Sequence, residues 1–456
     1  MKGLDYNLNN NSNNSIVVKF GGTSLATAEQ IKKVAAIINE NPQRKFVVAS
    51  APGKRFSDDI KITDLLYKCH SLARENKDFS EPLKNIHDRF LDIINGLGVQ
   101  NFDIKSEIIT LENNLKKISA PDYAASRGEY INSKIIAAFL NRPFIDAAEL
   151  IFFNDDGSLN EEKTYSSIAS KLKNLDNAVI PGFYGSLSDG NIKTFSRGGS
   201  DVTGSIIARG VNAVLYENWT DVSGMLSADP RIVDNPEVIN NITYTELREL
   251  SYMGASVLHE DAVFPVRKAR IPINIKNTNR PQDPGTKISA SLPPNLRLER
   301  LKHSPVTGIA GKKGFTSIRV EKNMMNNQTG FGAALLNIFA EHKISFEHCP
   351  TGIDSISVIV GSNLFDPKHQ EILYDINRNL NPDSVIVEDH LALIAVVGEA
   401  MVRSKGMAAK IFHALAEADI NIRMIDQGSN ELNIIIAVDE SDYENAVRAI
   451  YKELVN

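Results

Sequence analysis

A lysine, two glycines and two hydroxyl side chains stand close together near the start of the chain, in the run Lys19-Phe20-Gly21-Gly22-Thr23-Ser24. Glycines let backbone N–H groups approach an anion closely, and the start of a following helix adds partial positive charge. The lysine would supply the full charge that a phosphoryl group in transfer requires. The run therefore favours a polyphosphate site, with a plain tight turn as the alternative. It is not a Walker P-loop, because the lysine precedes the glycines.

A second glycine turn, Arg197-Gly198-Gly199-Ser200-Asp201, lies just before a predicted short helix over Val202 to Arg209. The Arg197 guanidinium could hold a carboxylate through two hydrogen bonds. The Asp201 carboxylate could orient Lys19 or bind a Mg²⁺ ion carried by phosphate. Ser200 is a good N-cap candidate, so a purely structural role for this turn stays open.

A third polar turn, Asn218 to Gly224, contains Thr220 and Asp221, and Asp229-Pro230-Arg231 follows it. Open α/β sheets bind ligands where polar turns follow the carboxyl ends of strands. Asp-Pro is also a common turn without function, so the signal is ambiguous on its own.

Glu129 follows Ser126-Arg127-Gly128 and opens a predicted helix that carries Ile131, Ile135, Ile136 and Phe139. A glutamate in a first helical turn usually only stabilises the helix dipole. It could instead bind the ammonium group of an amino-acid substrate.

The scaffold that would position these turns is predicted to be a parallel α/β sheet. Ile16 to Phe20 has the pattern of a buried strand. Thr27 and Gln30 form a capping box for a helix with an apolar stripe, and Lys45 to Ser50 is the next strand. Strand, helix and strand at this spacing are typical of parallel α/β folds. Further strands are predicted at 178–184, 213–218 and 273–276.

Residues 64–118 are predicted to be mostly helical, either as a lid or partner-contacting lobe or as a plain covering layer. The proline-rich stretch 280–294 predicts a linker that ends the large domain near residue 300.

An internal repeat follows, in which the segment from Gly330 to Phe346 recurs at a constant offset as Gly406 to Ile422. The strand after it keeps the same offset, since residues 357–360 correspond to 433–436. Each copy predicts a glycine turn, an amphipathic helix, a strand, a hairpin and a strand. Two small α+β modules in tandem are the economical interpretation.

The composition limits the class of protein. The chain has 456 residues, with 50 basic and 56 acidic side chains and a net charge of −6. This size favours two or three domains, and the charge gives no support to a nucleic-acid or membrane partner. Its two cysteines lie far apart and its nine histidines do not cluster, so we expect no protein-built metal site and a cytoplasmic location. Residues 1–14 are asparagine-rich and predict a disordered tail.

Together these motifs resemble the amino-acid kinase family and, within it, the aspartate kinases. KFGGTS at 19–24, RGGSD at 197–201, WTDVSG at 219–224 and ADPR at 228–231 occur in family order, and the repeat resembles two ACT domains. The resemblance implies an α/β/α sandwich kinase domain over 15–300. Two βαββαβ ACT modules would follow, over 301–390 and 391–456.

The resemblance also implies the reaction and the residues that serve it. ATP with Mg²⁺ would phosphorylate the side-chain carboxylate of L-aspartate, the first step of lysine, threonine and methionine biosynthesis. Lys19 would stabilise the phosphoryl group and Asp201 would organise the cations around it. The implied aspartate-binding residues are Ser50, Thr63, Glu129, Phe183, Arg197 and Ser200. The implied nucleotide-binding residues are Lys19, Gly21, Gly22, Thr23, Ser24, Thr220, Asp221 and Arg231. No general base is needed, because a carboxylate is already nucleophilic at neutral pH.

The same resemblance implies feedback inhibition by an amino acid bound to the first ACT module. The expected contacts are Met325, Gln328, Gly330 and Glu347, and an acidic residue at 347 suits the side-chain ammonium of L-lysine. Arg423 stands in the neighbouring region of the second copy, so two equivalent sites are not expected. A solvated charge at the end of a strand is the alternative for Glu347. ACT modules commonly pair between chains, so a homodimer or homotetramer is expected.

Two positions depart from the family pattern, Leu226 in place of tyrosine and Ser256 in place of lysine, and both bear on nucleotide contacts. The stretch 53–62 is an apparent insertion before Thr63. The competing interpretations are a kinase of the same fold for another substrate, such as glutamate, and a non-catalytic ACT-type amino-acid sensor. Threonine, alone or with lysine, is the alternative inhibitor.

Overall fold

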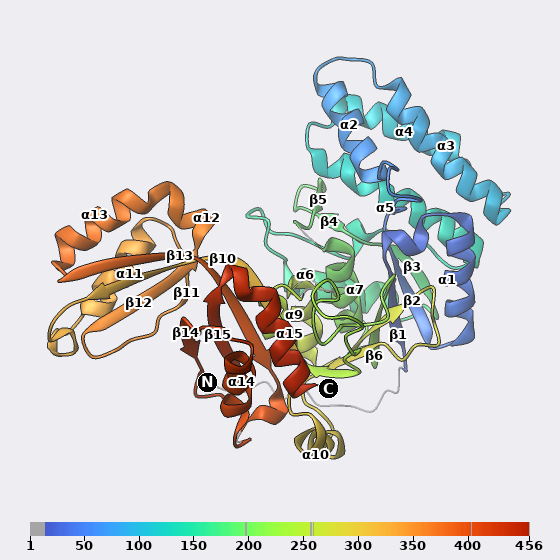
Figure 1. Cartoon of the computed structure of the whole chain (residues 1–456). Helices are drawn as coiled ribbons and strands as arrows, with labels where there is room; N and C mark the ends of the chain where they lie inside the picture. The colour runs from blue at the N-terminus through green and yellow to red at the C-terminus, as the bar shows by residue number, and fades with distance from the viewer. Residues whose placement is uncertain (1–13, 197, 256–257, 259, 403, 456) are drawn as a thin grey trace, which may run out of the picture. The chain divides into compact units, whose positions relative to one another are not determined.

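The computed structural model describes residues 14–196, 198–255, 258, 260–402 and 404–455, so the predicted tail lies, up to residue 13, outside the described residues (Figure 1). The described chain forms two compact units. The first covers the described residues within Met1–Met225, Asn240–Tyr244 and Val257–Ser291. The second covers those within Leu226–Ile239, Thr245–Ser256 and Leu292–Asn456.

The first unit is built on a seven-stranded sheet in the order β3-β2-β1-β6-β8-β9-β7. Five neighbouring strands of this sheet run parallel to one another, in the order β3, β2, β1, β6 and β8. Strand β9 is antiparallel to β8. The strands are β1 (Ile16–Phe20), β2 (Arg44–Ala49), β3 (Ala178–Pro181), β6 (Leu215–Thr220), β7 (Asn241–Thr243), β8 (Ile273–Asn277) and β9 (Thr286–Ser289). A separate antiparallel ribbon pairs β4 (Tyr184–Ser186) with β5 (Ile192–Thr194).

The helices of the first unit pack their apolar stripes on this sheet and on one another. They are α1 (Ala28–Glu40), α2 (Ile62–Arg74), α3 (Ser80–Leu97), α4 (Ile104–Lys117), α5 (Pro121–Leu140), α6 (Glu161–Leu172), α7 (Gly199–Gly210) and α9 (Glu260–Ala269). The region predicted as helical, 64–118, consists of α2, α3 and α4, which gather beside α5 in Figure 1. Their buried faces join one core with β1, β2 and α1, so this region is a packed part of the unit.

The second unit holds a six-stranded antiparallel sheet in the order β11-β12-β10-β13-β15-β14. The strands are β10 (Gly308–Glu321), β11 (Phe346–His348), β12 (Ser355–Gly361), β13 (Ser384–Val397), β14 (Met424–Asp426) and β15 (Asn433–Asp439). The helices are α10 (Pro294–His303), α11 (Phe331–Glu341), α12 (Ser362–Phe365), α13 (His369–Leu380), α14 (Met407–Glu417), α15 (Tyr443–Leu454) and α8 (Tyr244–Tyr252) after its first residue.

The internal repeat corresponds to two modules that share the long strands β10 and β13. The first module is complete in chain order, with strands β11-β12-β10-β13 and helices α11 and α13 on one core. The second takes its fourth strand from the first half of β10, where residues 308–313 pair with 392–397. Gly330 and Gly406, the repeated glycines, both have φ of 87° and precede α11 and α14. These positive φ angles explain why glycine recurs at the two positions.

Several local predictions are wrong in detail. The strand predicted at 178–184 ends at Pro181, and Phe183 turns the chain before β4 begins. Glu129 lies in the middle of α5 rather than in its first turn. Ser200 is inside α7, whose N-cap position is Gly198. The stretch predicted as a linker contains β9, which pairs with β7 and β8.

Within the described part of the chain, every helix is too short or too polar to cross a bilayer.

Candidate active site

The centre of the site is an ion pair at the carboxyl end of β1, between a buried lysine and a half-buried aspartate. The register of β1 and β6 sets Lys19 beside Asn218, and the first turn of α7 brings Asp201 to them. Lys19 Nζ lies 2.6 Å from Asp201 Oδ1, and Asn218 Nδ2 donates a hydrogen bond to the same oxygen at 2.8 Å. Lys19 is 7% exposed. A cation is therefore fixed at one place inside the protein, as the stabilisation of a phosphoryl group requires.

The glycine turn after Lys19 leaves room that side chains would fill. A Cβ atom at Gly21 would lie 3.5 Å from Lys19 Nζ. Gly53 donates its N–H to the Gly22 carbonyl at 2.7 Å, and a Cβ atom at Gly53 would meet the Gly22 carbonyl carbon at 2.5 Å. Thr23 is exposed, whereas Ser24 is buried and its Oγ lies 2.7 Å from Thr278 Oγ1. The Ser24 side chain thus stabilises the turn through its hydrogen bond with Thr278.

The stretch 53–62 contacts this turn through Gly53, and Asp59 holds the stretch together. Its carboxylate lies 2.9 Å from Arg55 and 2.7 Å from the buried Arg89. The hydrogen bonds from Arg55, followed by the charge of Arg89, hold the pKa of Asp59 well below its usual range. Thr63 follows as the second residue of α2 and is half-buried. The apparent insertion therefore has ordered contacts of its own.

Phe183 and Ser200 meet on the other side of the site. Phe183 has φ of 80°, a left-handed angle that is strained for a side chain of this size. The Thr203 hydroxyl accepts its N–H at 3.0 Å, and its carbonyl accepts the N–H of Phe195. A Cβ atom at Gly182 would lie 2.6 Å from Ser200 Oγ, so glycine is needed there. Strain of this kind at a ligand site is maintained by the surrounding contacts.

Glu129 is the most unusual side chain of the site. It is 6% exposed, and its Oε2 has no hydrogen-bond partner among the described residues. Burial raises the pKa of the Glu129 carboxyl to about 8, against a smaller opposite effect of the Ala51 backbone and of Arg127. A buried carboxyl with a free oxygen is destabilising unless a ligand pairs with it. Glu129 can therefore receive a cationic ligand.

The residues of the third turn are placed less closely. Thr220 ends β6 and its hydroxyl donates to Asp221 at 3.2 Å. Arg231 forms an ion pair with Asp229 at 2.6 Å and belongs to the second unit. Arg197 and Ser256 lie outside the described residues. The structure thus brings together Lys19, Asp201, the glycine turn, Ser50, Phe183 and Ser200. Glu129 lies on α5, the helix from which Asn132 donates to the Ser50 carbonyl. Thr220 follows Trp219, whose carbonyl accepts the Gly21 N–H at 3.0 Å.

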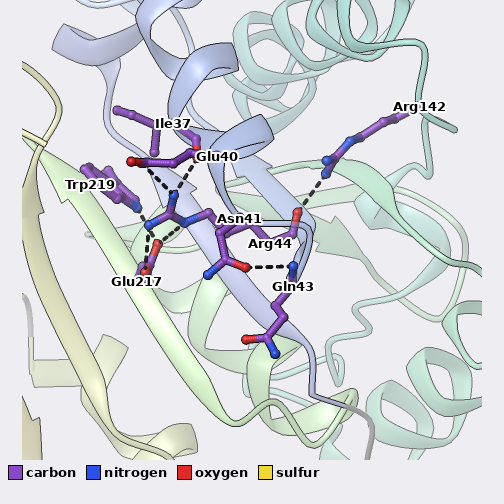
Figure 2. A network of polar contacts seen from close by, with 8 residues as sticks. All are labelled: Ile37, Glu40, Asn41, Gln43, Arg44, Arg142, Glu217 and Trp219. Atoms are coloured by element: carbon purple, nitrogen blue, oxygen red, sulfur yellow. Dashed lines mark hydrogen bonds and ion pairs between the residues drawn. The ribbon is translucent and has the colours of Figure 1, made fainter.

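An ion pair that the motifs did not indicate supports the site from the other face of the sheet (Figure 2). Arg44 donates to Glu217 through Nε at 2.8 Å and Nη2 at 3.2 Å, and Trp219 Nε1 donates to Glu217 at 2.8 Å. Arg44 also lies over the Trp219 ring, 5.2 Å from its centroid. The network joins β2 to β6, the two strands that flank Lys19. The available signal was Glu217 itself, an acidic residue inside a strand that is buried over residues 216–219.

The effector residues lie in the first ACT-like module. Met325 is buried in a short 3-10 helix, Met325–Asn327, after β10, and Gln328 and Gly330 connect that helix to α11. Glu347 lies on the edge strand β11 and accepts a hydrogen bond from the Tyr252 hydroxyl at 2.5 Å. Glu347 is half-buried, and its hydrogen-bond partner Tyr252 lies outside its own strand, at the end of α8.

Comparison with known proteins assigns this fold to a family. A model of the amino acid kinase family matches residues 14–277. The chain belongs to the amino acid kinase family. A model of the ACT domain matches residues 394–454, in the second C-terminal module of this amino acid kinase.

Relatives of this amino acid kinase match it over nearly its whole length. Aspartokinase 3 of Bacillus subtilis (strain 168) is 40% identical over 452 residues, which are 96% of this chain and 98% of the relative. The crystal structure of Clostridium acetobutylicum aspartate kinase is 49% identical, covers 96% of this chain and 99% of its own, and has a TM-score of 0.87. E. coli aspartokinase III in complex with aspartate and ADP shares the fold, with a TM-score of 0.72 at 24% identity over 97% of this chain and 100% of its own.

These matches confirm the resemblance to aspartate kinases and the predicted combination of a kinase domain with ACT modules. They also show that the match to the aspartokinases extends beyond the kinase domain into the regulatory modules.

Proposed function

We propose that this chain transfers the γ-phosphoryl group of ATP to the side-chain carboxylate of L-aspartate and so forms 4-phospho-L-aspartate. The observation that carries the proposal is the Lys19 ammonium, fixed by Asp201 and Asn218 beside the Gly21-Gly22 turn. The aspartokinase names of relatives at 40% and 49% identity support the choice of substrate.

The chemistry then rests on position and charge. Lys19 would stabilise the charge on the phosphoryl oxygens, because its own charge is held in place before the substrate arrives. The backbone of Gly21 and Gly22, with Thr23, Thr220, Asp221 and Arg231, would contact the nucleotide. The aspartate carboxylate attacks the γ-phosphorus directly, so that the phosphorus–oxygen bond to ADP breaks as the new one forms.

The amino acid would be held at both ends. Glu129 offers the free Oε2 to the α-ammonium, while Arg197 would bind the α-carboxylate. Ser50, Thr63, Phe183 and Ser200 would shape the pocket between them. An ammonium next to Glu129 favours its ionised form, so substrate binding should lower the pKa that burial raises.

Mg²⁺ would reach the site on the phosphates of ATP. Among the described residues no group of three or more His, Cys, Asp and Glu side chains could hold a metal ion, so the phosphate oxygens would supply most ligands. Asp201 is the carboxylate we expect to approach the ion, which prefers oxygen ligands. When bound, the ion would neutralise phosphate charge.

We further propose that L-lysine inhibits the enzyme by binding to the first ACT-like module through Met325, Gln328, Gly330 and Glu347. The support is chemical, since Glu347 already accepts a hydroxyl hydrogen bond from Tyr252 and can accept one from an ammonium. A homodimer or homotetramer formed through these modules, and a cytoplasmic location, remain predictions.

The test is ATP-dependent acyl-phosphate formation, trapped as the hydroxamate, with L-aspartate and with L-glutamate, each with and without lysine. We expect product with aspartate only, less of it with lysine, and loss of turnover by orders of magnitude in Lys19→Ala. Product with glutamate and none with aspartate would show that the chain is a kinase of this fold that acts on glutamate. No product with either, from folded protein, would favour the amino-acid sensor.

The same assay separates the regulatory proposal from the catalytic one. Glu347→Ala should keep the turnover of aspartate and lose the inhibition by lysine. Inhibition that is unchanged in this variant would contradict the proposed effector site, and inhibition by threonine in place of lysine would contradict the proposed effector.

A further inference from the structure

The buried helix α5 carries more polar side chains than the reaction has yet used. Glu129, Asn132 and Ser133 are buried together on it, and Asn132 and Ser133 are fully inaccessible to solvent. Glu129 Oε2, Asn132 Oδ1 and Ser133 Oγ each lack a hydrogen-bond partner among the described residues. Three unpaired polar atoms on one buried stretch of helix would be costly in a purely structural element.

The helix geometry places these atoms on one face. Residues three and four apart on a helix are neighbours, about 5–6 Å between their Cβ atoms, so Asn132 and Ser133 both lie beside Glu129. Glu129 and Asn132 also approach the same segment of chain. Next to Glu129, a Cβ atom at Gly128 would lie 2.9 Å from the Ala51 side chain, and Asn132 Nδ2 donates to the Ser50 carbonyl at 2.7 Å.

The contact with Ser50 settles which way the Asn132 amide points. Because Nδ2 donates to the Ser50 carbonyl, Oδ1 is the free acceptor. Ser50 in turn donates its N–H to the Phe20 carbonyl, at 3.3 Å, next to Lys19 in β1. Asn132 is thus joined through Ser50 to the strand that carries the phosphoryl-binding lysine.

We propose that Asn132 is a specificity-determining residue of the amino-acid site, whose Oδ1 accepts a hydrogen bond from the substrate α-ammonium alongside Glu129. The inference rests on the proposed aspartate kinase activity. An α-ammonium has three N–H donors and no acceptor, so it needs acceptors around it, and Glu129 Oε2 satisfies one donor. Asn132 Oδ1 is a second free acceptor one helical turn away, on an amide already fixed by Ser50.

The test compares two ligands that differ only at this group. L-aspartate has the α-ammonium, whereas succinate has the same carbon chain and both carboxylates without it. In Asn132→Leu we expect the KM for aspartate to rise about tenfold, with a smaller change in kcat, because a hydrogen bond to a charged group is lost. The inhibition constant of succinate against aspartate should stay within about twofold of the wild-type value.

Two further variants separate ligand contact from support of the loop. Asn132→Asp loses the donor to Ser50 and keeps an oxygen acceptor, so it should retain the preference for aspartate over succinate. Thr164→Val removes a buried hydroxyl on α6 that hydrogen-bonds to the Phe152 backbone. This variant should change neither the KM for aspartate nor the inhibition constant of succinate.

The outcomes decide between the possibilities. Equal weakening of aspartate and succinate in Asn132→Leu would mean that Asn132 acts only by fixing Ser50, and it would overturn the proposal, as would no change in either. Calorimetric measurement of the binding of both ligands to the whole chain distinguishes a failure of the proposed kinase function from a failure of the proposal for Asn132. A wild-type chain that binds aspartate and forms no hydroxamate would refute the kinase, while the comparison of ligands would still decide the role of Asn132.

Discussion

Glu129 shows how a single buried carboxyl couples ligand binding to stability. Its pKa is raised from an ordinary 4.5 to about 8, and desolvation is the main cause. Between these two pH values the folded chain holds a proton that the unfolded chain has released. The free energy of unfolding should therefore fall as the pH rises from about 4.5 to about 8, and then level off.

Replacing this carboxyl by an amide should remove that pH dependence. We expect Glu129→Gln to unfold at nearly the wild-type temperature at pH 4.5, and about 5 °C above it at pH 8.5, in the absence of ligand. Thermal unfolding of both proteins across this range is the measurement. Glu149→Gln, at an exposed ion pair with Lys171, is the matched control and should show no such trend. A constant difference between Glu129→Gln and the wild type would contradict the burial of this charge.

At the scale of the element, strand β6 separates the chemistry from its support. Tyr216 and Asn218 point to α7 and hydrogen-bond to Asp201. Glu217 and Trp219 alternate with them and point to the face where Arg44 lies (Figure 2). The two-residue period of a strand accounts for this division. Strand β6 thus orients the carboxylate that holds Lys19 and, through Glu217 and Trp219, also holds Arg44 of β2, which lies on the far side of β1.

Removing Arg44 should leave a buried carboxylate with too few partners. We expect Arg44→Met to lower the free energy of unfolding of the first unit by about 3–5 kcal/mol. Trp219 is the one tryptophan of the sequence and is fully buried, so its fluorescence during urea unfolding reports on this unit.

Two control variants identify the cause of that loss. In Arg44→Met/Glu217→Gln the loss should be smaller, because the amide oxygen can still accept the Trp219 hydrogen bond without an unpaired charge. Lys171→Met breaks an exposed ion pair and should change stability by less than about 1 kcal/mol. A double variant no more stable than Arg44→Met would mean that packing, not charge, dominates at this position.

Sequence patterns predicted the elements better than the contacts between them. Of the predicted capping box, the N-cap bond is confirmed, since Thr27 Oγ1 accepts the N–H of Gln30 at 3.3 Å. The return bond from the Gln30 side chain is not made, because Gln30 Oε1 has no hydrogen-bond partner among the described residues and Gln30 Nε2 donates to Asn279. The helix predicted to start at Glu129 begins at Pro121, and Gly128 lies inside it, where a Cβ atom would come within 2.9 Å of the Ala51 side chain. The pairing of Arg44 with Glu217 and the orientation of Asn132 depend on strand register and distant loops. No local pattern encodes these.

At the scale of the whole molecule, the repeat predicted two modules and did not predict that they share the long strands β10 and β13. Strand β10 has its first half in one module and its second half in the other, with irregular pairing near Gly314, where φ is 91°. Ile309 joins the core of the second module with Ile436 and Leu415, whereas Ile318 joins the core of the first. Long-range pairing of this kind leaves no periodic signal in a single sequence.

Replacing either of two isoleucines of β10 by alanine should therefore destabilise a different module. Ile309 and Ile318 are 1% and 0% exposed, and each change to alanine should cost about 2–5 kcal/mol. In the full chain, hydrogen exchange should quicken in β15 for Ile309→Ala and in β12 for Ile318→Ala, because local openings follow the packing of each core. The two variants are matched in chemistry, so each serves as the control for the other. Faster exchange in β12 for Ile309→Ala, with β15 unchanged, would show that β10 does not complete the second module. Equal loosening of both would mean instead that the shared strands make the two modules a single cooperative unit, through which an effector bound at one module would stabilise both.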